Sequence, residues 1–117
     1  MTGIGQRSRT LGSLGCGCGV SKSLQVVGDR WTLMLLHTAS EGTARFEGFR
    51  EGLGIARNIL SGRLRHMVEE GLFERIRYQS HPDRFEYRLT AKGRDLVDAL
   101  NTFGRWADRW LPTNGPA

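Results

Sequence analysis

The sequence lacks the features of a membrane or secreted protein. Its longest apolar run is four residues, Leu33 to Leu36, far below the roughly 20 residues that a membrane helix needs. The first residues, MTGIGQRSRTLGSLG, contain no apolar segment of the kind found in a signal peptide. We therefore expect a cytoplasmic protein that does not associate with a membrane.

Cysteine and histidine are also scarce. The two cysteines, Cys16 and Cys18, lie in the run GCGCG, and such close neighbours do not build a disulfide framework for a domain. The three histidines, His37, His66 and His81, are spread along the chain without the spacing of zinc ligands. We expect no metal and no other cofactor.

Catalytic motifs are missing as well. The sequence shows no phosphate-binding glycine loop, no nucleophile paired with a base and no close pair of carboxylates in a plausible cleft. We therefore expect that the protein is not an enzyme.

Lysine is rare, although the chain is basic. Of 17 basic residues only Lys22 and Lys92 are lysines, and the net charge is +5. Arginine makes bidentate contacts with phosphates and base edges that lysine does not make. A basic domain most often has an anionic partner, and we expect double-stranded DNA.

The 117 residues divide into three segments by composition. Residues 1–15 are predicted to be a flexible basic arm, 16–111 to form one folded domain, and 112–117 to be a disordered tail. Within the domain, apolar spacing predicts helices over 20–28, 30–40, 46–53, 56–70 and 91–111. Asp29 and Thr90 are expected to cap the helices that follow them.

Two strands, RIRY and FEYRL, are predicted between the last two helices, and the short stretch TARF at 43–46 is a weaker strand candidate. A mostly α chain with a small antiparallel β-hairpin, in this order, is typical of a winged helix-turn-helix domain with a long C-terminal dimerisation helix. The alternative is a helical bundle with an incidental hairpin, and the basic hairpin tip favours the winged fold.

The helix over 56–70 has two unlike faces. Leu60, Leu64 and Met67 fall in one sector, which we expect to face the core. A polar face of this kind suits the DNA major groove, where Asn pairs with adenine and Arg with guanine. The alternative is an ordinary solvated surface. The candidate DNA-binding residues on the polar face are Arg57, Asn58, Ser61, Gly62 and Arg65.

The hairpin tip, SHPDR, is poorly placed to build a core. Arg84 is expected to enter a minor groove or to pair with a phosphate, and His81 to donate to phosphate oxygens. The alternative is a solvated tip. The positions expected to hold the strands against the core are Ile76, Tyr78, Phe85, Tyr87 and Leu89.

The last predicted helix carries more apolar surface than a small domain buries easily. Exposed aromatic stripes usually indicate association. We expect a symmetric homodimer that reads a pseudo-palindromic operator, with half-sites about one DNA turn apart. The alternatives are one enlarged monomer core, or a protein-interaction module that uses the aromatic helix without binding DNA. The expected interface residues are Val20, Leu24, Val27, Leu100, Phe103, Trp106 and Trp110.

Together these motifs resemble the HxlR family of bacterial winged-helix regulators, which are relatives of the MarR group. The resemblance rests on Cys18 ahead of GDRW at 28–31, on RFEGFREGL at 45–53, on GIARNILSGRLRHMVEEGL at 54–72 and on FEYRLTAKGRDL at 85–96. It implies a dimeric transcriptional repressor or activator. It places Arg57, Asn58, Ser61 and Arg65 in the major groove and Arg84 on the wing. Ala56 departs from the family, which often has a capping Ser at this position.

The resemblance also implies an effector, either a small molecule or an oxidant or electrophile. In some family members the cysteine that matches Cys18 senses oxidants or electrophiles, and here Cys16 is a candidate resolving partner. A helix N-terminus immediately downstream and Lys22 one turn on favour a reactive thiolate. The alternative is a half-buried structural cysteine.

Overall fold

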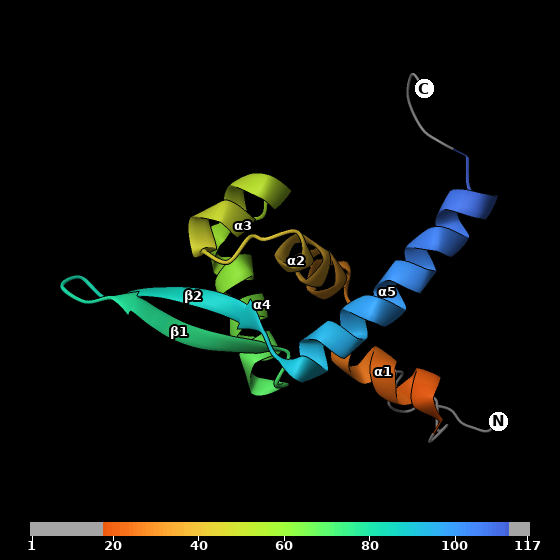
Figure 1. Ribbon diagram of the computed structural model, residues 1–117, viewed down its shortest axis with the longest axis horizontal. Coiled ribbons are helices and arrows are strands. Elements are labelled where there is room, and N and C mark those ends of the chain that lie inside the picture. The colour runs from red at the N-terminus through yellow and green to blue at the C-terminus, as the bar shows by residue number, and fades with distance from the viewer. Residues whose placement is uncertain (1–17, 113–117) are drawn as a thin grey trace. The chain divides into compact units, whose positions relative to one another are not determined.

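A computed structural model describes residues 18–112, which form five helices and one two-stranded sheet (Figure 1). The described chain is mostly helical, as predicted. It divides into a first compact unit that ends at Leu33 and a second that begins at Met34. The predicted arm at 1–15 lies outside the described residues, as does all of the predicted tail except Pro112.

The first unit contains α1 (Gly19–Val27) and the first turn of α2 (Arg30–Ser40). Asp29 caps α2, as predicted, because its Oδ1 accepts from the Thr32 backbone N–H (2.9 Å) and its Oδ2 from the Thr32 hydroxyl (2.8 Å). An N-cap carboxylate satisfies a donor that has no partner within the helix.

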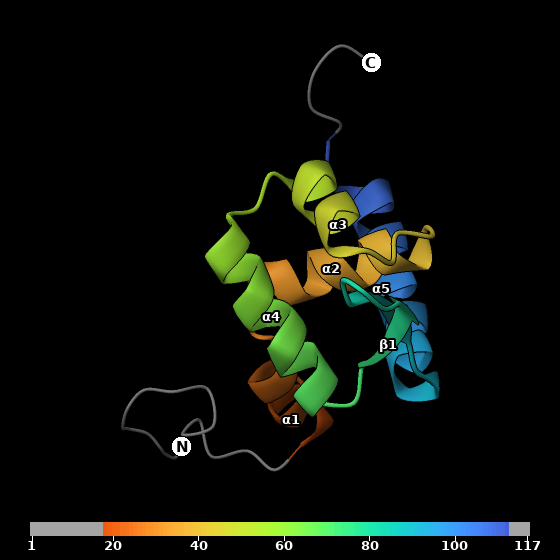
Figure 2. The same ribbon diagram turned by 90° about the vertical axis from the view of Figure 1, so that its left-hand side faces the viewer.

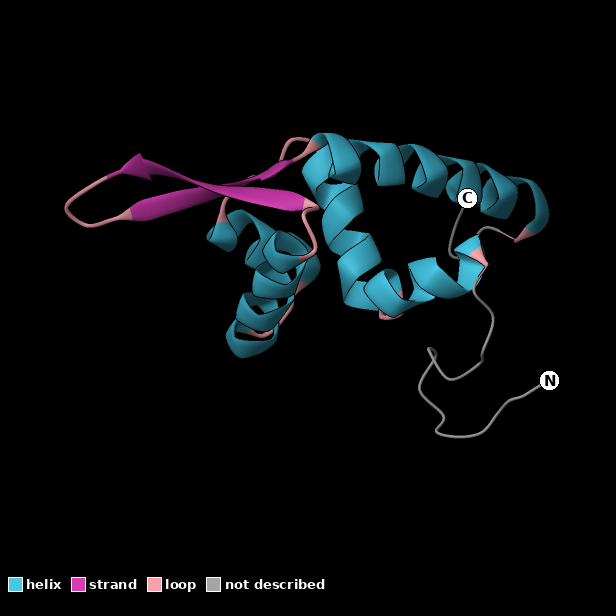
Figure 3. Ribbon diagram, turned by 90° about the horizontal axis from the view of Figure 1, so that it is seen from below, coloured by secondary structure: helices cyan, strands magenta, loops and turns pink. Residues whose placement is uncertain are grey.

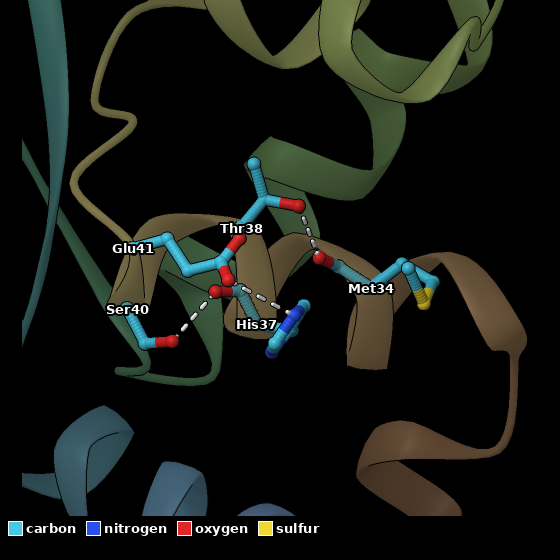
Figure 4. Close-up of polar contacts among 5 residues, drawn as sticks. All are labelled: Met34, His37, Thr38, Ser40 and Glu41. Atoms are coloured by element: carbon cyan, nitrogen blue, oxygen red, sulfur yellow. Dashed lines mark hydrogen bonds and ion pairs between the residues drawn. The ribbon is translucent and has the colours of Figure 1, made fainter. Parts of the chain in front are cut away.

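The second unit begins with the rest of α2, whose polar side chains bond back to the helix near its end (Figure 4). The hydroxyl of Thr38 donates to the Met34 carbonyl (2.8 Å), and that of Ser40 to the His37 carbonyl (2.6 Å). His37 Nε2 also lies 3.5 Å from Glu41 Oε2. Local bonds of this kind satisfy carbonyls at the end of a helix.

Helix α3 (Phe46–Leu53) and helix α4 (Arg57–Glu69) form the helix-turn-helix (Figures 1 and 2). Gly54 ends α3 with a φ of 65°, a left-handed conformation that glycine adopts readily. Ala56 occupies the N-cap of α4 without a side-chain cap bond, as a methyl side chain requires. Gly71, with a φ of 76°, follows the end of α4.

The hairpin pairs β1 (Phe73–Gln79) with β2 (Arg84–Leu89) in antiparallel register. Both strands are longer than RIRY and FEYRL. The third predicted strand is reduced to one bridge between Arg45 and Glu86, beside a bond from the Tyr87 N–H to the Ala44 carbonyl (2.7 Å).

The prediction of which side chains hold the hairpin was partly wrong. Ile76 lies opposite Glu86 in the register, on the other face from Phe85, because successive strand residues alternate between faces. Tyr78 lies at an irregularity between Arg77 and Gln79 and is 38% exposed. Phe73, only 2% exposed, supplies the anchor instead.

The core of the second unit lies between α2, α3, α4 and the root of the hairpin. Leu60, Leu64 and Met67 are buried on the inner face of α4, as predicted. The Phe73 ring lies 6.0 Å from that of Phe49 and 6.4 Å from that of Tyr87, measured between centroids. The hairpin is thus fastened to the helices by aromatic contacts, and the other buried apolar residues are Leu35, Leu36, Ile55, Leu72 and Val97.

Helix α5 (Ala91–Trp110) starts against the end of α4. Thr90 caps it as predicted, since its hydroxyl accepts from the Gly93 N–H (3.0 Å) and donates to the Gly71 carbonyl (2.5 Å). Lys92 Nζ donates to the Glu70 carbonyl (2.6 Å). A Cβ added at Gly93 would overlap the carbonyl oxygen of Leu72. Helix α5 and the hairpin leave this junction in different directions (Figures 1 and 3).

No helix within residues 18–112 is long and apolar enough to cross a lipid bilayer.

Candidate nucleic-acid interface

The polar face of α4 points outward over its whole length. Arg57, Asn58, Ser61 and Arg65 are exposed. Gly62 is half-buried, and a Cβ added there would meet no heavy atom within 4 Å. The predicted division of the helix into an inner and an outer face is therefore what the structure shows.

Arg57, at the start of α4, is held by two residues of α3. Its Nη2 lies 2.8 Å from Glu47 Oε2, and its guanidinium carbon lies 5.7 Å from the centroid of the Phe46 ring. The other carboxylate oxygen of Glu47 accepts from Arg50 Nε at 2.8 Å. This hydrogen bond is the main reason why the pKa of Glu47 is lowered, and the positive charges of Arg50 and Arg57 add to the effect.

An open pocket of about 400 Å³ lies between α4 and the hairpin. Ser61 and Arg65 line it from α4, and Arg75 and Tyr87 line it from the strands. The Arg75 guanidinium carbon lies 3.9 Å above the centroid of the Phe85 ring, which restrains its position. Two guanidinium groups from different elements thus line one concave surface.

A second open pocket, of about 430 Å³, adjoins the first and shares Phe46 and Tyr87 with it. Its lining includes Arg45 and the predicted wing residue Arg84. The polar face of α4 and the wing arginine therefore open toward the same side of the second unit. His81 is exposed at the tip and lines neither pocket.

Arg45 is packed against the hairpin. Its guanidinium carbon lies 3.9 Å from the centroid of the Tyr78 ring, and its Nη2 lies 3.5 Å from Glu86 Oε2. Arg88 Nη2 lies 2.8 Å from the other carboxylate oxygen of Glu86. The pKa of Glu86 is lowered, chiefly by the hydrogen bond from Arg88.

These contacts define a helix–hairpin surface, made of the outward face of α4 and the arginines beside it. The sequence analysis missed three of its members. Arg75 alternates with Phe73 along β1, so the strand pattern contained a signal for its direction. Arg45 and Glu47 carried no comparable signal, because their partners Tyr78 and Arg57 lie on other elements. The residues of the surface are Arg57, Asn58, Ser61 and Arg65 on α4, with Arg45, Arg75 and Arg84.

Helix α5 presents a different surface, an aromatic stripe made of Phe103, Trp106 and Trp110. These side chains are 62%, 53% and 68% exposed. The Phe103 and Trp106 rings stack, with centroids 6.2 Å apart and planes inclined by 13°. Leu100, also predicted at the interface, is half-buried.

The predicted interface residues of the first unit lie on α1. Val20 is 70% exposed, Leu24 is 37% exposed and Val27 is half-buried. Cys18 occupies the N-cap of α1 and is disulfide-bonded, whereas Cys16 lies outside the described residues. Across residues 18–112, no three His, Cys, Asp or Glu side chains cluster as metal ligands would.

Comparison with known proteins gives consistent matches. The model of the HxlR-like helix-turn-helix family matches residues 26–115. An uncharacterized HTH-type transcriptional regulator of Mycobacterium tuberculosis is 50% identical over 93 residues, which cover 80% of this chain and 59% of the relative. The chain thus spans about three fifths of that relative's length.

Solved structures agree with this match. The crystal structure of PA1607 superposes with a TM-score of 0.78 at 36% identity, covering 88% of this chain and 72% of that chain. The redox regulator HypR, in its reduced form, superposes with a TM-score of 0.73 at 29% identity, covering 79% and 92% of the two chains.

Proposed function

The chain belongs to the HxlR-like helix-turn-helix family, and from this premise we propose that it regulates transcription by binding double-stranded DNA as a homodimer. The family is one of transcriptional regulators, as the names of the relatives indicate. This agrees with the prediction that the chain is not an enzyme.

The observation that carries the proposal is the convergence of arginines on one side of the second unit. Arg65 and Arg75 line one pocket, and Arg45 and Arg84 line the next. Helix α4 lies between these arginines and offers Asn58 and Ser61 to solvent. A helix with a polar face enters a major groove, while flanking arginines contact the phosphates on either side.

The proposed roles differ along this surface. Arg57, Asn58 and Arg65 read base edges, because Arg and Asn match guanine and adenine in the major groove. Ser61 and Gly62 let the helix backbone approach the groove. Arg45, Arg75, His81 and Arg84 contact the phosphate backbone or the adjoining minor groove.

The proposed dimer is built from the aromatic stripe of α5 and the exposed apolar residues of α1. Large aromatic residues are the usual anchors of protein interfaces. A two-fold dimer presents two α4 helices to a pseudo-palindromic operator. The exposure of the stripe also supports the second candidate, a protein-interaction module that does not bind DNA.

The two candidates differ in their response to salt. Selection from a pool of random duplexes, followed by titration at several salt concentrations, tests the DNA proposal. We expect log affinity to fall linearly with log salt concentration. Arg65→Ala should relax base preference, whereas Arg84→Ala should weaken binding to all duplexes about equally. An oligomer that ignores every duplex would favour the interaction module.

An effector is also part of the proposal. Cys18 is the candidate sensor of an oxidant or electrophile, with Cys16 as its resolving partner, and the similarity to HypR, a redox regulator, supports it. The test is DNA binding before and after treatment with diamide or an aldehyde. We expect the wild type to respond and Cys18→Ser not to respond. Equal behaviour of the two proteins would leave only a small-molecule effector.

A further inference from the structure

Glu47 lies inside a surface that otherwise favours anions. It is in the first turn of α3, it is half-exposed, and it touches Arg57, one of the residues proposed to read bases. A carboxylate beside a DNA backbone repels the phosphates, so its presence here weakens general binding. Its position therefore calls for a role that outweighs this repulsion.

The contacts of Glu47 are specific in geometry. One carboxylate oxygen receives Arg50 Nε at 2.8 Å and the other lies 2.8 Å from Arg57 Nη2. The Phe46 ring contacts the Arg57 guanidinium as well. Arg57 is thus restrained by a carboxylate and by an aromatic ring, although 63% of its side chain is exposed.

Such a pair contributes little to the stability of the fold, because an exposed ion pair is screened by water and salt. Its effect on a binding site is larger. A free arginine side chain loses many rotamers when it docks on a guanine, whereas a preorganised one has already lost them. Glu47 engages Nη2, and a guanidinium has five N–H donors, so others are left for a base edge.

We propose that Glu47 is a specificity-determining positioning residue, which orients the Arg57 guanidinium for one base pair of each half-site. The inference rests on the proposed DNA-binding function. The carboxylate exchanges general affinity for discrimination: it repels any phosphate that comes near, and it keeps Arg57 aimed at the groove instead of at the backbone.

The experiment begins with sites selected from random duplexes by the wild-type protein. Arg57→Ala then identifies the base pair that Arg57 reads, as the position where discrimination falls about tenfold. Glu47→Ala is measured on the same selected duplex and on its single-base-pair variants. Glu51→Ala is the matched control, because it removes the same charge from an exposed position on the same helix.

We expect both glutamate variants to bind non-specific duplex a few fold more tightly, since each removes one negative charge. Only Glu47→Ala should also lose discrimination at the Arg57 base pair, by about fivefold or more. Equal discrimination profiles for Glu47→Ala and Glu51→Ala would overturn the inference and leave the DNA-binding function intact. Absence of any selected sequence for the wild type would overturn both. Circular dichroism melting confirms that each variant is folded.

Discussion

The helix–hairpin surface and the aromatic stripe belong to the same unit but differ in chemistry. The first gathers arginines from α4, the hairpin and the segment before α3, and restrains several of them with aromatic rings or carboxylates. The second exposes three large aromatic side chains on one terminal helix. Arginines ordered in this way suit an anionic partner, and exposed indoles suit an apolar one. The contrast supports two separate partners, DNA and a second copy of the chain.

The two surfaces are joined at the start of α5, and the largest effect is expected there. Gly93→Ala would place a methyl group against the Leu72 carbonyl, which is main chain and cannot turn aside. We expect a loss of about 3 kcal/mol or more in the free energy of unfolding, measured with urea.

Gly104→Ala is the matched control for that change. Gly104 lies in the same helix, and a Cβ there would meet nothing within 4 Å. We expect a gain of about 1 kcal/mol or less, from helix propensity alone. Similar stability of the two variants would show that the junction is not as tight as the structure indicates.

The next effect concerns the aromatic stripe. Trp106→Ser removes an exposed indole that stacks with Phe103. We expect the dissociation constant of the proposed dimer to rise about 30-fold or more, as for a central interface anchor. Sedimentation measures this, with Asn101→Ala, an exposed polar position of α5, as the control. An unchanged dimer would place the interface elsewhere.

A smaller effect is expected at Arg45, whose role in the helix–hairpin surface emerged only from the structure. Arg45→Ala removes the guanidinium that stacks on Tyr78. We expect several-fold weaker binding to all duplexes and a salt slope reduced by about one unit. Arg105→Ala removes the same charge from α5 and is expected to have little effect on either quantity. If both arginine variants behaved alike, general electrostatics rather than a contact would explain the loss.

Most of the fold was accessible from the sequence because its signals are local. Leu60, Leu64 and Met67 recur at helical spacing, and Asp29 and Thr90 are capping residues placed directly before helices. The hairpin faces were harder to predict. An apolar residue at Ile76 suggested an inward position, but the register from Phe73 gives the inward positions to Arg75 and Arg77.

The candidate site was predicted only where one helix carries it. The outward residues of α4 follow from a helical wheel, whereas Arg45 and Glu47 matter through Tyr78 and Arg57, which belong to other elements. Contacts between elements depend on tertiary packing, and a single sequence does not encode them in its periodicity.

The smallest expected effect is a loss of stability in acid that originates in the helix–hairpin surface. Glu47 and Glu86 have pKa values below the usual 4.5, chiefly because Arg50 and Arg88 donate hydrogen bonds to them. Groups whose pKa is lower in the folded state stabilise the fold at neutral pH. This contribution is fully present above the unfolded value near 4.5 and is lost as the pH falls through the lower folded values.

Urea unfolding at pH 7 and pH 3 measures this loss. Glu86→Gln should show a smaller difference between the two pH values than the wild type. Arg88→Ala should reproduce that result, because the hydrogen bond from Arg88 is the first cause of the shift. The Glu86 side chain is 15% exposed and that of Glu47 is 50% exposed, so water screens Glu86 less. We therefore expect Glu86→Gln to change the pH dependence more than Glu47→Gln, and the reverse order would assign the acid sensitivity to α3 instead of the hairpin.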